Sequence, residues 1–153
     1  LGTVGKPAEL LAIKGDAARG KELFLNTAGV ACKNCHRVGE VGSTLGPELT
    51  HIASKYSRAQ LLESILEPSK FIDPKYVMYL VETSQGRVLS GVLVEKNGDA
   101  VVLRDAQDQT VRIPAKDVQQ FVSQRQSIMP ELLLRDMTAE QVADLLEFLD
   151  SLK

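Results

Sequence analysis

The sequence contains few of the residues that bind metals or cross-link a chain. Its 153 residues include two cysteines, two histidines and three methionines. A zinc site needs four ligands, and His51 is the only histidine outside the segment that holds both cysteines. No apolar run approaches the ~18 residues of a transmembrane helix, so we expect no membrane span. The formal net charge of -2 excludes a generally basic nucleic-acid binder.

The composition is that of an ordinary globular protein, with 44% hydrophobic and 25% charged residues. We expect a single domain over residues 1–153 that carries a smaller insertion. The chain starts Leu1-Gly2-Thr3, without an initiator Met or a signal-peptide pattern. We therefore expect a mature product or an excised piece of a larger protein.

Charge is distributed unevenly along the chain. Residues 1–58 carry eight Lys/Arg against five Asp/Glu, whereas residues 128–153 carry two against six. Two solvated faces and a docking dipole are both consistent with this pattern.

Both cysteines lie in the segment Cys32-Lys33-Asn34-Cys35-His36. This spacing is typical of covalent haem attachment, in which each thiol forms a thioether and the adjacent imidazole binds the iron. A redox dithiol and a zinc site are the alternatives. The first is expected beside a strand-helix-strand pattern, which the sequence lacks, and the second needs more ligands. We predict one covalent haem c on Cys32 and Cys35, with His36 as an iron ligand.

An iron-binding histidine usually donates its second ring N–H to a carbonyl or carboxylate. The residues after the motif, with Gly39, Gly42, Gly46 and Pro47, are predicted to form a loop. The Gly46-Pro47 turn is the candidate for the carbonyl that His36 needs.

Three helices are predicted around this loop. Asp16 is a plausible N-cap for residues 16–28, in which Gly20 marks a close helix crossing. Capping boxes predict a short helix from Ser57 to Pro68 and an amphipathic C-terminal helix after Thr138. We expect the C-terminal helix to cross the first helix at Gly20.

The segment between these helices is rich in Val, Leu and Tyr. It predicts four short antiparallel strands joined by hairpins, of which Asn97-Gly98 is the clearest turn. The strands are expected at residues 76–83, 88–95, 100–104 and 110–113. We interpret residues from about 75 to 122 as an inserted small β-sheet in an otherwise mainly α, class I-like cytochrome c helical fold.

A thioether is the common sixth ligand of electron-transfer haems. Met129 precedes Pro130 in an irregular stretch, where the proline ring forces an extended backbone, so we predict Met129 as the second iron ligand. Met137, His51, Met78 and an open or water-bound site are the alternatives. Met78 is expected to pack in a strand, Met137 beneath the last helix, and His51 at the surface.

Two further side chains, Tyr56 and Arg58, are candidates for hydrogen bonds to a haem propionate, because buried carboxylates need donors. Packing and surface exposure are equally consistent with each. Lys33, between the two cysteines, and Arg37, directly after His36, could steer an acidic partner or be solvated charges.

The sequence resembles the haem-binding domain of Pirellula/Verrucomicrobium type, a c-type cytochrome domain with an insertion between the haem attachment site and the methionine. The resemblance extends from about residue 16 to 152. It rests on the residues at 32–36, 45–50, 55–57, 62–69, 86–88 and 127–131. It implies that Cys32 and Cys35 bind haem covalently, with His36 and Met129 as axial ligands. Ile128 stands where leucine is common.

The resemblance also implies a setting. Such domains often follow a propeller-like dehydrogenase domain in larger exported proteins, so a periplasmic or other exported location is expected. With both axial sites filled, the expected function is single-electron transfer from a dehydrogenase to a downstream acceptor, without enzymatic activity of its own. A haem-based redox or gas sensor with a labile Met ligand is the alternative, while no distal acid-base residue supports a peroxidase. The β insertion could be a docking surface, a homodimer interface or a stabilising element.

Overall fold

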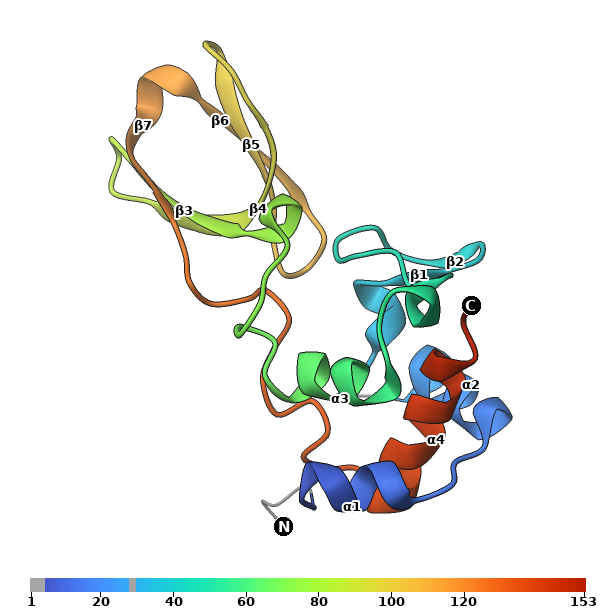
Figure 1. Ribbon diagram of the computed structural model, residues 1–153. Helices are drawn as coiled ribbons and strands as arrows, with labels where there is room; N and C mark the ends of the chain where they lie inside the picture. The colour runs from blue at the N-terminus through green and yellow to red at the C-terminus, as the bar shows by residue number, and fades with distance from the viewer. Residues whose placement is uncertain (1–4, 28–29) are drawn as a thin grey trace. The chain divides into compact units, whose positions relative to one another are not determined.

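The computed structural model describes residues 5–27 and 30–153. They divide into two compact units. The helical unit comprises the described residues up to Lys70 together with Pro130–Lys153, and the β unit comprises Phe71–Met129 (Figure 1). The chain therefore leaves the helical unit once, completes the β unit and returns.

The helical unit contains four α-helices within the described residues. They are α1 (Pro7–Ala12), α2 (Ala17–Asn26), α3 (Arg58–Leu66) and α4 (Ala139–Asp150). Two 3-10 turns, η1 (Cys32–Asn34) and η2 (Ile52–Ser54), and a two-stranded ribbon of β1 (Arg37–Val38) and β2 (Val41–Gly42) connect them. Helix α1 was not predicted, and the predicted end of the first helix at residue 28 lies outside the described residues.

The N-terminal signals in the sequence explain where three helices begin. The Asp16 side chain accepts a hydrogen bond from Arg19 N–H at 2.9 Å and caps α2. Ser57 with Gln60, and Thr138 with Gln141, form complete capping boxes at the starts of α3 and α4. The polar ends of these helices are thus satisfied by residues that the sequence places there.

The predicted crossing of α2 and α4 at Gly20 is confirmed. A Cβ atom on Gly20 would lie 1.9 Å from the carbonyl oxygen of Asp144 and 2.8 Å from the Cβ of Phe148. Only a residue without a side chain allows this approach. Beside it, Phe24 and Phe148 pack edge to face with ring centroids 5.6 Å apart.

A hydrophobic core lies around this crossing. Its fully or nearly fully buried members come from α1, α2, α3, α4, η2 and the turn before α4, and they include Leu10, Phe24, Ile52, Leu61, Leu62, Leu134, Val142, Leu145, Leu146, Phe148 and Leu149. The apolar face predicted for the C-terminal helix supplies Val142, Leu145, Leu146 and Leu149 to this core, whereas Leu152, which continues the predicted pattern, is only partly buried against it.

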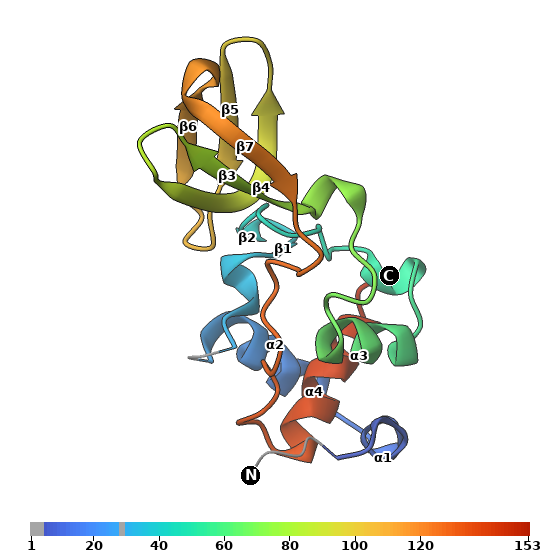
Figure 2. The ribbon, with the colours of Figure 1, turned by 90° about the vertical axis from the view of Figure 1, so that its left-hand side faces the viewer.

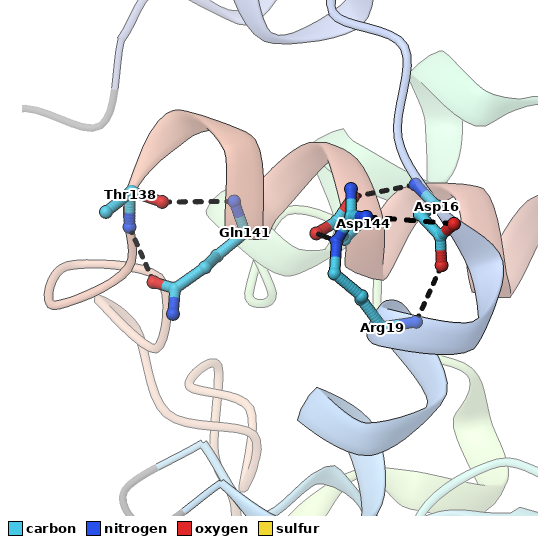
Figure 3. A network of polar contacts seen from close by, with 5 residues as sticks. All are labelled: Asp16, Arg19, Thr138, Gln141 and Asp144. Atoms are coloured by element: carbon cyan, nitrogen blue, oxygen red, sulfur yellow. Dashed lines mark hydrogen bonds and ion pairs between the residues drawn. The ribbon is translucent and has the colours of Figure 1, made fainter.

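One buried carboxylate, Asp144, also faces α2 (Figure 3). It accepts hydrogen bonds from Asp16 N–H at 2.7 Å, and from Arg19 Nε at 2.8 Å and Nη2 at 2.9 Å. The bidentate Arg19 contact lowers the pKa of Asp144 below its ordinary value of 3.8, against the opposing effect of burial. This network fixes the start of α2 against the middle of α4.

Replacing Asp144 with Asn should lower the free energy of unfolding at pH 7 by about 2 kcal/mol, because charge-assisted hydrogen bonds to a buried group are lost. The pKa of Asp144 is lowered by folding, so the carboxylate stabilises the protein above its unfolded pKa. This contribution is lost as the pH falls through the lower, folded pKa. Urea unfolding of both proteins should therefore show a constant difference from pH 7 to about pH 5 that shrinks below about pH 4.

Asp150→Asn on the same helix is the matched control. Asp150 is the last residue of α4, where an acidic side chain gains nothing from the helix dipole. Its replacement should leave stability within about 0.5 kcal/mol of the original. Equal losses of unfolding free energy in the two variants would show that the Asp144 network stabilises the protein no more than Asp150 does.

The β unit is built on a five-stranded antiparallel sheet in the order β6-β5-β4-β3-β7 (Figure 2). The strands are β3 (Met78–Thr83), β4 (Val88–Lys96), β5 (Ala100–Arg104), β6 (Thr110–Pro114) and β7 (Val118–Ser123). Two 3-10 turns, η3 (Pro74–Tyr76) and η4 (Ala115–Asp117), precede β3 and β7. The four predicted strands are confirmed with shifts of up to two residues, whereas β7 was not predicted as a strand.

The β unit has a core of its own. Val81, Val101, Leu103 and Ile113 are buried on one face of the sheet. At its edge, Tyr79 and Phe121 stack with centroids 4.5 Å apart, and Lys96 Nζ lies 4.3 Å from the Phe121 ring. The Asn97 side chain accepts hydrogen bonds from Asp99 and Ala100 N–H, which confirms the predicted turn at Asn97-Gly98.

The prediction of a mainly α fold is wrong. The protein is 33% helical and 24% strand, and its described residues form a five-stranded sheet as well as four helices. The sheet includes the strand β7, buries its own apolar residues and forms a compact unit. Among the described residues, no helix has the length and apolar character that crossing a membrane requires.

Candidate haem-binding site

Both cysteines lie at a 3-10 turn in the helical unit. Cys32 begins η1, and its carbonyl accepts hydrogen bonds from Cys35 N–H at 3.1 Å and His36 N–H at 2.9 Å. Ala31, immediately before the turn, has a left-handed backbone with φ +40°. In the described residues, the two thiols are not joined by a disulfide. The turn thus brings both thiols and His36 into one short segment.

The His36 ring is held by the loop that follows it. Its Nδ1 lies 2.7 Å from the carbonyl oxygen of Pro47, which is the contact predicted from the sequence. Because a carbonyl only accepts hydrogen bonds, Nδ1 must carry the proton. The tautomer is therefore fixed, and Nε2 is the nitrogen with a lone pair for a metal.

Gly46 lies directly against this ring. A Cβ atom at this position would be 2.8 Å from His36 Cε1 and 3.1 Å from Nδ1. Gly46 N–H also donates to the carbonyl of Cys35 at 2.7 Å. The turn that holds the imidazole therefore needs a residue without a side chain at this position.

Three backbone hydrogen bonds join the loop to the motif and to Arg37, which follows it. Ser43 N–H donates to Lys33 O at 3.0 Å, Gly46 N–H to Cys35 O, and Leu49 N–H to Arg37 O at 2.9 Å. A short ribbon of β1 and β2 lies within the predicted loop, so this segment has more regular structure than expected. The position of Pro47 is therefore set by hydrogen bonds within the helical unit.

Burial shifts the pKa values of the His36 imidazole and the Cys32 thiol. It lowers the pKa of His36, and the Pro47 hydrogen bond opposes this shift. It also raises the pKa of Cys32 to about 11. A neutral imidazole is the form that coordinates a metal, so His36 is suited to binding iron at pH 7.

A family model described as Cytochrome c matches residues 17–102. The match spans more than half of the chain and includes the whole Cys32–His36 segment. The chain belongs to the cytochrome c family. No curated protein matches it.

Membership of the cytochrome c family supports a c-type cytochrome with covalently bound haem c and a haem-based role in electron transfer. Members are typically electron carriers that act with redox partners, and they are typically exported. The matched residues extend into the β unit as far as β5, and they end before Met129 and α4. The attachment site thus lies inside the recognised part and the predicted methionine ligand outside it.

The donor set suits haem c better than zinc. Two thiols and a tautomer-fixed imidazole in one pentapeptide are the groups that covalent haem attachment uses. Across residues 5–27 and 30–153, no group of three or more His, Cys, Asp or Glu side chains could hold a metal ion. The His36 imidazole fills the space beside position 46, so a side chain there would collide with the ring.

The three methionines of this cytochrome have different surroundings. Met78 is in β3 and pairs with Val92, and Met137 packs against the helical core, as the sequence predicted for both. Met129 lies outside regular secondary structure, partly buried, as the last residue of the β unit. Its assignment as an iron ligand stays a prediction.

His51 and Arg58 both have partners inside the protein. His51 is exposed, and its Nδ1 donates to the Lys153 carbonyl at 3.0 Å, in agreement with the predicted surface position. Arg58 is mostly buried and donates to Glu147 at 2.6 Å and to the Ile13 carbonyl at 3.1 Å. These contacts give Arg58 a structural role between α1, α3 and α4.

The two basic residues at the motif, one inside it and one directly after it, also differ. Arg37 donates to the carbonyl of Gly39 at 2.8 Å and to Glu40 at 3.1 Å, so its charge is already paired. Lys33 is half-buried. Tyr56 is 38% exposed.

Sequence reasoning predicted Asp16 as the N-cap of α2 but missed Arg19 and Asp144, which complete the network at this helix start. Asp144 lies more than 120 positions from both Asp16 and Arg19, and no local pattern connects it to them. An acidic residue on the apolar face of the C-terminal helix was the available signal, because a buried charge needs a partner.

Proposed function

We propose that this cytochrome carries single electrons on one haem, which Cys32 and Cys35 would hold covalently and whose iron His36 and Met129 would bind. The observation that carries the proposal is the His36 ring, whose Nδ1 is held at 2.7 Å by Pro47 O so that Nε2 is available. When bound, the haem supplies an iron that gains and loses one electron. Met129 is favoured by its place before Pro130 in an irregular segment.

The residues of this chain would control access to the iron. With an imidazole and a thioether as ligands, substrates have no free coordination position, and only outer-sphere electron transfer remains. His36 would keep its orientation through Pro47, and the thioethers of Cys32 and Cys35 would hold one haem edge against η1. The function is therefore an electron carrier without catalytic activity of its own.

We infer that the donor is a dehydrogenase, in some arrangements a domain of the same parent protein, and that a separate protein accepts the electron. The resemblance to domains of Pirellula/Verrucomicrobium type supports this setting and an exported, periplasmic location. Encounters of this kind usually bury less than ~1,200 Å² of surface. The half-buried Lys33 within the attachment segment is the basic residue proposed to meet an acidic partner.

We propose that residues 1–153 act as one cytochrome domain with a β-rich insertion at about 75–122. The separate core of the β unit supports a role beyond linking two helices, such as partner docking or formation of a homodimer. Replacing exposed Val88 or Val122, which are 61% and 46% exposed, would test these roles by their effect on assembly.

The proposal can be tested with spectra of the oxidised and reduced protein. Acid extraction of denatured protein should leave the haem on the chain, because thioethers resist acid, and the ferric protein should show a band at about 695 nm from Met-to-iron charge transfer. Release of the porphyrin by acid would contradict covalent attachment. A ferric spectrum without the band would contradict methionine ligation.

Carbon monoxide distinguishes the carrier from a sensor. A stable thioether ligand should keep the ferrous protein from binding carbon monoxide at neutral pH on the time scale of mixing. Rapid, stoichiometric binding would instead support a sensor in which Met129 leaves the iron.

Tyr56 is proposed as a hydrogen-bond donor to a haem propionate. Replacing it with Phe should lower the midpoint potential on the order of 30 mV, the equivalent of one weak hydrogen bond, because the propionate loses a partner that offsets its charge. Redox titration of Tyr56→Phe beside Tyr76→Phe, a tyrosine of η3 in the β unit, measures this. An unchanged potential in Tyr56→Phe would remove Tyr56 from the haem site.

A further inference from the structure

The segment that leads to Met129 starts at a fixed point in the sheet. Gln124 N–H donates to the carbonyl of Met78 at 2.8 Å, which extends the pairing of β3 with β7 by one residue. Between Gln124 and Pro130 the chain has no regular secondary structure. Met129 is therefore carried by a short irregular segment that begins at the end of β7.

Two constraints act on the backbone of Met129 within this segment. Its N–H donates to the side-chain oxygen of Ser127 at 3.1 Å. This is a local turn in which a hydroxyl replaces a backbone carbonyl as the acceptor. On the other side, the ring of Pro130 restricts Met129 to extended conformations. Both ends of the residue are thus fixed independently of what its side chain binds.

We propose that Ser127 is a positioning residue for the iron ligand Met129. This inference rests on the proposed function, because it assumes that the Met129 thioether binds the iron. The Ser127 hydroxyl orders the backbone before the metal bond forms, so that the thioether loses less conformational freedom on binding. Ser127 itself touches no reacting atom and acts through the Met129 amide.

The functional consequence would be an iron whose coordination position for external ligands stays occupied by the Met129 thioether. A sixth ligand on an unrestrained segment would leave the iron for a larger fraction of the time, and an external ligand would bind in that fraction. The turn at Ser127 shifts this equilibrium towards the closed form. The hydroxyl would thereby separate an electron carrier from a protein whose iron binds small molecules.

The test uses exogenous imidazole, which competes with methionine for ferric iron. Ser127→Ala should raise the apparent imidazole affinity about fivefold, which corresponds to the loss of one net hydrogen bond. The band at about 695 nm should also weaken at a given imidazole concentration. Ser127→Thr and Ser127→Asn keep an acceptor for the same N–H and should restore the affinity of the original protein.

Ser123→Ala is the matched control, because Ser123 is an exposed serine in β7 of the same unit. It should leave the imidazole affinity unchanged. An imidazole affinity in Ser127→Ala equal to that of the original protein would overturn the role of Ser127 alone. Absence of the band from the original protein would overturn methionine ligation and this inference together.

Discussion

Replacing Met129 with leucine is expected to abolish the ferric band at about 695 nm and to lower the midpoint potential on the order of 100 mV. Leucine keeps the apolar volume of the side chain but lacks the sulfur that binds iron and favours the ferrous state. The open position should also allow the ferrous protein to bind carbon monoxide. Optical spectra, redox titration and carbon monoxide binding on the purified holoprotein measure the three effects.

The other two methionines provide controls of the same chemistry. Met78→Leu alters strand β3, and Met137→Leu alters a contact with the helical core. Both should retain the band and the potential within the error of titration. If the band persisted in Met129→Leu and disappeared in Met137→Leu, the ligand would be Met137.

Gly46→Ala is expected to reduce the haem content of the purified protein several-fold and to lower its unfolding free energy by about 2 kcal/mol. The new Cβ atom would lie 2.8 Å from His36 Cε1, closer than two carbon atoms can approach. The imidazole would have to tilt away, which strains its 2.7 Å contact with Pro47 O. The absorbance ratio of haem to protein and urea unfolding report the two effects.

Gly98→Ala is the matched control for added volume. Nothing lies within 4 Å of a Cβ atom at Gly98, so this variant should keep full haem content. A Gly46→Ala protein with normal haem content and normal stability would show that the loop shifts to accept the methyl group. The His36–Pro47 contact would then be less rigid than its geometry indicates.

Local signals in the sequence predicted the helices well. Both capping boxes are present, and Gly20 marks the crossing of α2 and α4. Helix α1 was missed although Pro7 stands at its first position and Glu9 in its first turn. A helix of six residues has too few apolar positions to show a periodic pattern.

The extent of the sheet depended on contacts that no local pattern reports. Strand β7 pairs with β3 across about 40 residues, and its residues Gln119 and Gln120 interrupt the apolar pattern. The hairpins were predictable because Asn97-Gly98 and similar turns act within a few residues. The fold was therefore wrongly predicted to be mainly α, because a local pattern does not report pairing between strands that are distant in sequence.

The parts of the candidate site that depend on residues at fixed spacing in the sequence were predicted. The Cys32–His36 segment and the Pro47 carbonyl follow from motif and turn residues, and the His36–Pro47 contact is present. Arg58 was considered for the haem but contacts Glu147 and Ile13. Whether Arg58 donates to a haem propionate or to these oxygens depends on tertiary packing, which a sequence pattern does not report.

The pairing of β7 with β3 places the two ends of the insertion beside each other, because residue Tyr79 stands opposite Ser123. To the helical unit, the insertion is equivalent to a loop whose ends are already closed. Hairpins between these strands could therefore lengthen or shorten during evolution without changing the distance that the chain must bridge. A family with this arrangement could acquire new partner specificities in its sheet while the haem attachment segment remained unchanged.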